Sequence, residues 1–155
     1  MNIYLSWAGS QSEKVARQLK DIFCDIFYTK IEVFNSPDDI PLGKNALYVK
    51  SKALNKTSFG VFCFDKGNLN NTWMLFELGA ISKGDMKDTT VIPLLIDLSK
   101  EELQDPIRMF TPMSYTKIGL KKLVLLINES LNNDKMERTF LERRFETEWK
   151  TNFQT

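Results

Sequence analysis

The sequence predicts an α/β fold in which helices cover both faces of a parallel β-sheet. Strand-like apolar runs alternate with stretches whose apolar residues recur at helical spacing, and the connections between them are short. This alternation is typical of a parallel sheet with crossover helices on its two faces. Residues 58–64 form an apolar run without polar alternation, as expected for a strand covered on both faces. At 155 residues, the chain is long enough for one domain with a substantial core.

Five segments have the composition of β-strands, and the last has the weakest pattern. In chain order they are residues 3–7, 31–34, 58–64, 89–96 and 114–117. Pro93 lies in the fourth segment and has no N–H for a neighbouring strand, so we expect that part at an edge or end of the sheet. Residues 99–112 are predicted to be irregular, with one helical turn before Pro106.

Five helices are predicted between and after these strands. They cover approximately residues 10–27, 45–54, 72–83, 120–131 and 136–153. Ser10 and Glu13 have the spacing of a capping box at the start of the first helix. The last helix carries a Met, Phe and Trp stripe, which we expect to pack against this domain or a neighbour.

Composition and charge exclude several classes of partner. The chain has 21 basic and 20 acidic side chains, a net charge of +1, which gives no reason to expect nucleic acid or an anionic membrane. No apolar run approaches the roughly 20 residues that span a bilayer, and the N-terminus lacks the pattern of a signal peptide. We therefore expect a cytoplasmic protein without nucleic-acid or membrane partners.

The absence of histidine excludes familiar catalytic machinery. With no histidine, the chain has neither a Ser-His-Asp triad nor an imidazole base nor a His-ligated zinc site. Two cysteines, Cys24 and Cys63, are too few for an all-cysteine zinc site. We expect no metal and no cofactor, so any chemistry must use carboxylates, hydroxyls, amides and groups of the substrate.

Glu77 is the most informative residue of the sequence. It is the one acid in the apolar segment 72–80, which reads as a helix. Trp73 lies four residues earlier, so its indole and the carboxylate share a helix face. A buried lone carboxylate is costly unless it is paired or used. The plainer alternatives are an acid favoured by the helix dipole and a tryptophan in the core.

Three polar loops follow the first three predicted strands. They comprise residues 7–10, 35–43 and 65–72 and are rich in Gly, Asn, Asp and Ser. Ligands of open parallel sheets bind at the carboxyl ends of the strands, where these loops lie. Neither G-x-G-x-x-G nor G-x-x-x-x-G-K-[ST] is present, although the first loop could offer backbone N–H groups to a phosphate.

Four motifs in order resemble a bacterial TIR (Toll/interleukin-1 receptor) domain. The motifs are the start at residues 3–10, the second strand and BB loop at 33–43, the third strand at 59–64, and the Trp-x-x-x-Glu helix at 73–80. The similarity runs from residue 3 to about 131 and is loose over 99–118. It implies a flavodoxin-like fold with a five-stranded parallel sheet, a TIR domain over 1–133, and a C-terminal helix or linker over 134–155.

The resemblance also implies an activity. TIR enzymes cleave NAD+ at the nicotinamide–ribose bond, as effectors or signal producers of antiphage immunity. The Trp-x-x-x-Glu pattern places Glu77 at the catalytic position, with NAD+ as substrate. Nicotinamide leaves as a neutral molecule, so no general acid is needed and a chain without histidine can perform the reaction. The expected substrate-binding residues are Ser6, Trp7, Ala8, Gly9, Ser36, Asp38, Asp39, Phe64 and Trp73.

Several alternatives remain open at this stage. Asp38 and Asp39 are also typical turn formers, and Trp7 suits either the core or a pocket wall. The TIR resemblance further implies self-association, with residues 36–43 as contact or gating element, and allows for a sensor domain or partner protein. We expect linear ADP-ribose as the main product. The other functions considered are a cyclic ADP-ribose synthase, a non-catalytic TIR assembly module and a nucleoside deoxyribosyltransferase-like enzyme.

Overall fold

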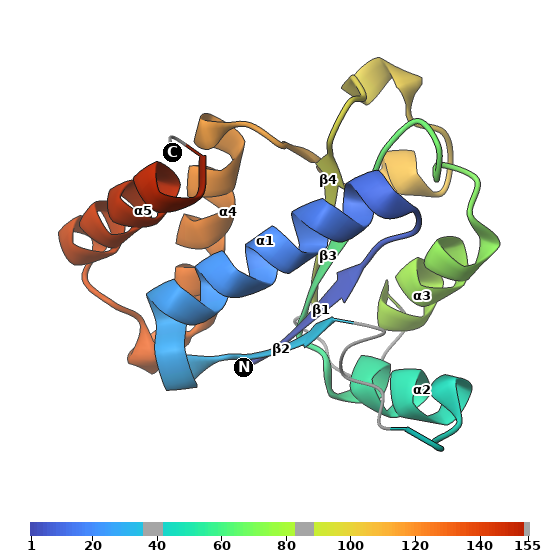
Figure 1. Cartoon of the computed structure of the whole chain (residues 1–155), viewed down its shortest axis with the longest axis horizontal. Coiled ribbons are helices and arrows are strands. Elements are labelled where there is room, and N and C mark those ends of the chain that lie inside the picture. The colour runs from blue at the N-terminus through green and yellow to red at the C-terminus, as the bar shows by residue number, and fades with distance from the viewer. Residues whose placement is uncertain (36–41, 83–88, 154–155) are drawn as a thin grey trace.

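A five-stranded, fully parallel sheet forms the centre of the computed structural model, which describes residues 1–35, 42–82 and 89–153 (Figure 1). The strands lie in the order β2-β1-β3-β4-β5. Their bounds are β1 Asn2–Ser6, β2 Glu32–Asn35, β3 Phe59–Phe64, β4 Thr90–Leu95 and β5 Met113–Ser114. This order places the two longest apolar strands, β3 and β4, next to each other, and it confirms the predicted fold class.

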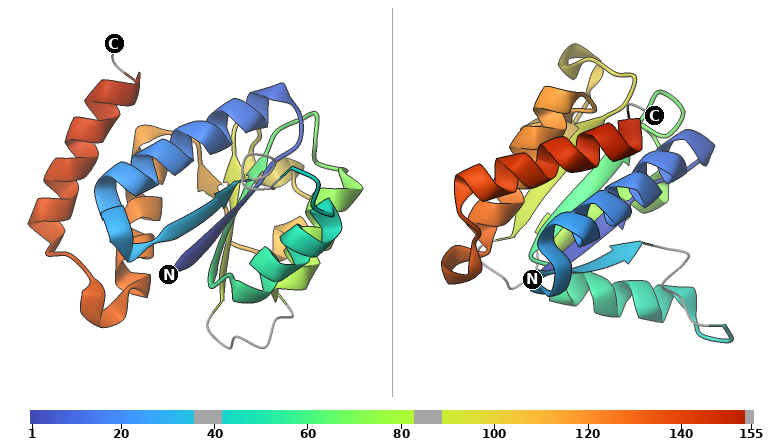
Figure 2. Two further views of the ribbon diagram at one scale, coloured as in Figure 1. Left: turned by 60° about the horizontal axis from the view of Figure 1, so that its bottom comes forward. Right: turned by 60° about the vertical axis from the view of Figure 1, so that its left-hand side comes forward.

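Five helices cover the two faces of the sheet. Their bounds are α1 Ser10–Phe27, α2 Ala46–Lys56, α3 Thr72–Ser82, α4 Lys117–Ser130 and α5 Arg138–Phe153. Figures 1 and 2 show α1, α4 and α5 on one side of the sheet and α2 and α3 on the other. Short 3-10 turns occupy Tyr28–Lys30, Lys100–Glu102, Ile107–Met109 and Asn132–Asp134.

Each face of the sheet has its own apolar cluster. The larger core cluster joins Ile3 and Leu5 of β1 to residues of α1, α4 and α5. The smaller core cluster joins Tyr4 of β1 and alternate residues of β3 to α2 and α3. Neighbouring residues of a strand point to opposite faces, so β1 contributes to both clusters. Every residue of β3 is buried, as the unbroken apolar run predicted.

Helix α5 is part of the larger core cluster. Leu141 and Phe145 are buried there, and Trp149 and Phe153 pack against it. The helix contacts both α1 and α4, and the two views of Figure 2 show it beside them. Within the predicted stripe, Phe140 instead faces solvent and is 43% exposed.

The start of α1 differs from the prediction. The predicted capping box of Ser10 and Glu13 is wrong, because α1 begins at Ser10 and its N-cap is Gly9. Gly9 has φ +92°, a backbone conformation that glycine adopts readily. Glu13 instead pairs with Arg17 at 2.9 Å on the exposed side of the helix.

The fifth strand is shorter than predicted and lies earlier. Only Met113 and Ser114 pair, with Leu94 and Leu95 of β4. Thr116 does not extend the strand, because its side chain caps α4 by accepting the Gly119 N–H. Pro93 pairs with Phe62 of β3 but with no residue of β5. On the β5 side, this part of β4 is therefore an edge of the sheet, as expected for a residue without an N–H.

Gly119 and Gly79 are predicted to respond in opposite ways to alanine. A Cβ at Gly119 would lie 1.9 Å from the Ser114 carbonyl oxygen, so α4 would have to move away from β5. We expect Gly119→Ala to lower the free energy of unfolding by at least about 2 kcal/mol. Gly79 lies in α3 with nothing within 4 Å of a new Cβ, so Gly79→Ala should stabilise by about 0.5–1 kcal/mol. Urea unfolding of both variants measures this, and equal effects would contradict it.

Candidate functional site

Glu77 lies inside the protein, on the side of α3 that faces the sheet. Helix α3 follows β3 after a short loop, and Asn71 caps it by accepting the Met74 N–H at 2.9 Å. Glu77 is 3% exposed and is a buried charged residue in an apolar helix. This burial matches the feature that made the residue conspicuous in the sequence. A carboxylate in such a place requires compensating polar neighbours.

Those neighbours come from β1 and α2. Burial raises the pKa of Glu77 above its usual value, while the Tyr4 hydroxyl, the Lys50 ammonium and the Ser6 hydroxyl act in the opposite direction. Tyr4 and Ser6 are two residues apart in β1 and therefore share the face toward α3. Burial, together with the charge of Glu77, also raises the pKa of Tyr4. The carboxyl group is thus held close to two hydroxyls and one cation.

No group of the described residues other than Glu77 engages the two hydroxyls. Tyr4 Oη and Ser6 Oγ are both buried, and neither has a hydrogen-bond partner of normal geometry among the described residues. Both nevertheless lie near enough to Glu77 to favour its charged form. Buried polar groups are rarely left without partners, so these donors are available to Glu77 or to a bound molecule.

Lys50 and Trp73 form the open side of the site. Lys50 Nζ lies 3.9 Å from Glu77 Oε1 and 5.1 Å from the centre of the Trp73 ring. Trp73 is 38% exposed and stacks on Phe76 with ring centres 5.4 Å apart. The indole therefore offers a partly exposed flat surface one turn before the carboxylate.

Lys50 and Tyr4 were not among the predicted site residues. Helix α2 carries three lysines, at 50, 52 and 56, and its sequence pattern does not distinguish them. Tyr4 could have been found, because residues i and i+2 of a strand share a face and Ser6 was already a candidate.

The loop after β1 is fixed by Asn68. The Asn68 amide donates to Ala8 O at 3.1 Å, to Ser12 Oγ at 3.2 Å and to Cys63 O at 3.0 Å, and its oxygen accepts the Asp65 N–H at 2.9 Å. The Ala8 N–H is also used, since it donates to Ser12 Oγ at 3.1 Å. Asn68 thereby ties the loops after β1 and β3 together, a role that the sequence did not reveal.

The remaining predicted residues are placed differently. Trp7 packs against the larger core cluster, on the sheet face away from Glu77, and its indole donates to Asn35 Oδ1 at 2.6 Å. Phe64 is fully buried in the smaller core cluster, where it stacks on Phe62. Ala8 packs against that same cluster, and Gly9 is the cap of α1. Ser36, Asp38 and Asp39 lie outside the described residues.

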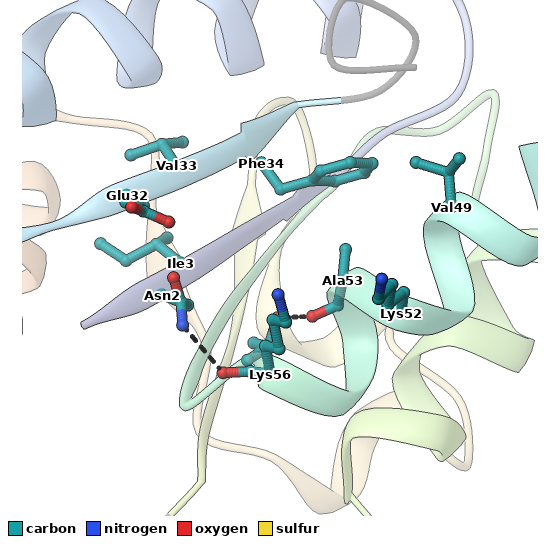
Figure 3. A pocket seen from close by; sticks show the side chains of 10 residues that line it. Asn2, Ile3, Glu32, Val33, Phe34, Val49, Lys52, Ala53 and Lys56 are labelled. Carbon is teal, nitrogen blue, oxygen red and sulfur yellow. Dashed lines mark hydrogen bonds between the residues drawn. The ribbon is translucent and has the colours of Figure 1, made fainter. Parts of the chain in front are cut away.

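A cavity of about 260 Å3 lies beside this site, between α2 and the edge strand β2 (Figure 3). Val33, Phe34, Val49 and Ala53 give it apolar walls, and Lys52 reaches its rim. Phe34 stacks on Tyr4 with ring centres 5.2 Å apart. This cavity therefore adjoins the Glu77 site through Tyr4, although none of the predicted site residues lines it.

The described residues contain neither a group of potential metal ligands nor a helix suited to span a membrane. Within residues 1–35, 42–82 and 89–153, no three His, Cys, Asp or Glu side chains are grouped so that they could hold a metal ion. In the same ranges, no helix combines the length and the apolar character needed to cross a bilayer.

Comparison with known proteins gives a match in structure and none in sequence. No model of a known protein family matches the chain, and no curated protein does. Among solved structures, the chain is similar to the TIR domains of the activated Roq1 resistosome, which directly recognises the pathogen effector XopQ. The similarity has a TM-score of 0.54 at 19% sequence identity and covers 95% of this chain and 82% of the other. Together with the strand order β2-β1-β3-β4-β5, this match establishes the flavodoxin-like α/β fold of a TIR domain.

Proposed function

We propose that the protein is an NAD+ glycohydrolase that cleaves the nicotinamide–ribose bond. The observation that carries the proposal is the buried Glu77 carboxylate, one helical turn from the partly exposed Trp73, in a TIR fold. Two buried hydroxyls beside the carboxylate, those of Tyr4 and Ser6, favour its charged form. Function is inferred from this site, because a fold alone supports many activities.

The residues suit a dissociative cleavage. The nicotinamide ring is cationic in NAD+ and neutral once it leaves, while positive charge develops on the ribose. The Glu77 carboxylate would stabilise that charge and hold ribose hydroxyls, with the Tyr4 and Ser6 hydroxyls orienting it. Trp73 would stack on a flat ring of the substrate. Water would then add to the ribose carbon and release a proton to solvent, giving linear ADP-ribose and leaving Glu77 unchanged.

The pH dependence of the reaction should report the Tyr4 hydroxyl. Tyr4 lowers the pKa of Glu77, so Tyr4→Phe is expected to raise that pKa. Since the ionised carboxylate is the active form, activity falls as the pH drops through its pKa. The acid limb of the kcat/KM profile should therefore move to higher pH in Tyr4→Phe. Tyr48→Phe, on the exposed side of α2, serves as control. A Tyr4→Phe profile that overlays the wild-type profile would contradict this role.

The biological setting follows from the proposed chemistry. We propose a cytoplasmic immune effector of the antiphage type that depletes NAD+ and acts through self-association, with a sensor domain or partner protein as trigger. The similarity to TIR domains of a resistosome supports self-association. Specific activity should then rise with protein concentration, whereas a flat value in a protein that is monomeric by light scattering would contradict assembly.

One incubation separates the proposed function from its alternatives. The protein is mixed with NAD+, or with a deoxynucleoside and a free base, and the products are resolved by chromatography. Nicotinamide plus mostly linear ADP-ribose supports the glycohydrolase. A cyclic ADP-ribose as main product would indicate a signal-producing enzyme, and base exchange would indicate a deoxyribosyltransferase. Intact NAD+ and deoxynucleoside would indicate a non-catalytic module.

A further inference from the structure

Lys50 occupies the place in the candidate site that a cationic ring would need. Its ammonium lies 3.9 Å from Glu77 Oε1 and 5.1 Å from the centre of the Trp73 ring. A carboxylate and the face of an indole both attract positive charge. These two groups therefore form a cation site, and in this structure the cation is supplied by the protein itself.

We infer that Lys50 is an internal occupant of the Glu77–Trp73 cation site and that a planar organic cation must displace it in order to bind. The inference rests on the proposed function and deepens it, because it names a residue outside α3 that limits access to the carboxylate. Lys50 thus acts on binding and takes no part in the bond cleavage.

The contacts of Lys50 are loose enough for displacement. The separation of 3.9 Å from Glu77 is longer than the 2.8 Å between Lys117 and Glu146, and it exceeds the length of a charge-assisted hydrogen bond. Lys50 belongs to α2, whereas Glu77 and Trp73 belong to α3. Its side chain is 17% exposed, so the flexible four-carbon stem can swing the ammonium toward water.

Removing the ammonium should therefore improve binding of a competing cation. A long ion pair and one cation–π contact are each weak, so the occupied site should bind such a cation roughly fivefold to tenfold less tightly than a vacated one. If Lys50 instead attracts an anionic part of a ligand, the opposite is expected. Removing the ammonium would then weaken binding of the anionic ligand and leave binding of the competing cation unchanged.

The test uses 1-methylnicotinamide, a pyridinium cation without a ribose to cleave. Its dissociation constant is measured by quenching of tryptophan fluorescence at mildly alkaline pH, because burial raises the pKa of Glu77 and a higher pH favours its ionised form. Lys50→Met should bind the probe roughly fivefold to tenfold more tightly than wild type. Lys50→Gln is a second neutral variant with the same expectation.

Three controls make the comparison specific. Lys50→Arg keeps the charge and should bind the probe no more tightly than wild type. Lys52→Met removes a neighbouring lysine of α2 that lies over Tyr48 at 5.8 Å, so it should leave binding unchanged. Adding Glu77→Gln to Lys50→Met should abolish the gain, because the carboxylate is half of the site.

The outcomes separate this inference from the proposed function. Tighter probe binding in both neutral variants supports the inference, even if wild type releases no nicotinamide from NAD+, in which case the proposed function alone falls. Unchanged, weaker or undetectable binding in the neutral variants overturns the inference, whether or not NAD+ is cleaved.

Discussion

Replacing Glu77 by glutamine is expected to lower the rate of nicotinamide release from NAD+ by a factor on the order of 10²–10³ or more. The amide has nearly the same shape as the carboxylate but carries no charge. It therefore cannot stabilise the positive charge that develops on the ribose as the bond breaks. The loss should appear in kcat as well as in kcat/KM, because the interaction is strongest in the transition state.

The same substitution should leave the protein folded. Burial raises the pKa of Glu77, and a carboxyl group of this kind stabilises the fold below its unfolded-state pKa and loses that contribution as the pH rises through the folded-state pKa. At neutral pH a neutral glutamine removes the cost of the buried charge, so the melting temperature should not fall appreciably. Glu142→Gln, which replaces a partly exposed acid paired with Arg138, is the control and should keep full activity. A folded Glu77→Gln protein with unchanged turnover would remove Glu77 from the reaction.

Phe145→Ala is expected to lower the free energy of unfolding by about 3–5 kcal/mol. Phe145 is buried in the larger core cluster and lies against Trp149 with ring centres 6.2 Å apart. Its removal would leave a cavity among α1, α4 and α5. We expect the melting temperature to fall by roughly 10 °C or more.

Phe140→Ala is the matched control for that prediction. It removes the same side chain from the same helix, but Phe140 is 43% exposed, with the Arg144 guanidinium 5.4 Å from its ring centre. Its loss should cost less than about 1 kcal/mol. If Phe145→Ala cost as little stability as Phe140→Ala, the packing of α5 would contribute little to folding. The predicted boundary at residue 133 would then separate a self-sufficient domain from an appended helix.

The central strand β3 and the helix α3 that follows it are predictable from local sequence. The run from residue 58 to 64 is apolar without interruption, and the segment after the next loop has one carboxylate in helical register with a tryptophan. Both features are local, so β3 and α3 were predicted close to their observed bounds. The parallel order followed from the alternation of strands and helices.

Features that depend on distant contacts were harder to predict. The identity of the cation beside Glu77 is fixed by how α2 packs on α3, and the sequence of α2 does not single out Lys50. The side chain of Asn68 joins loops that are far apart in sequence. Trp7 directly follows β1 and packs against the larger core cluster, on the other face of the sheet from Tyr4, and its apolar character alone does not distinguish the two faces.

Short elements and caps were the other source of error. The last strand consists of two residues, too few to give a pattern, and Thr116 next to it serves as a helix cap. At the start of α1, a glycine takes the N-cap position in place of the predicted serine. The expected roles of Ser36, Asp38 and Asp39 remain predictions.

Cleavage of NAD+ is tested most directly by measuring the amount of nicotinamide that the wild-type protein releases. The Glu77→Gln protein at the same concentration gives the background. The protein should be assayed at high concentration, because self-association is expected to raise its activity. We predict that wild type releases nicotinamide in equal amount to the NAD+ consumed, while Glu77→Gln stays at background. Intact NAD+ in a folded, concentrated wild-type sample, or equal release by both proteins, would contradict the proposed function.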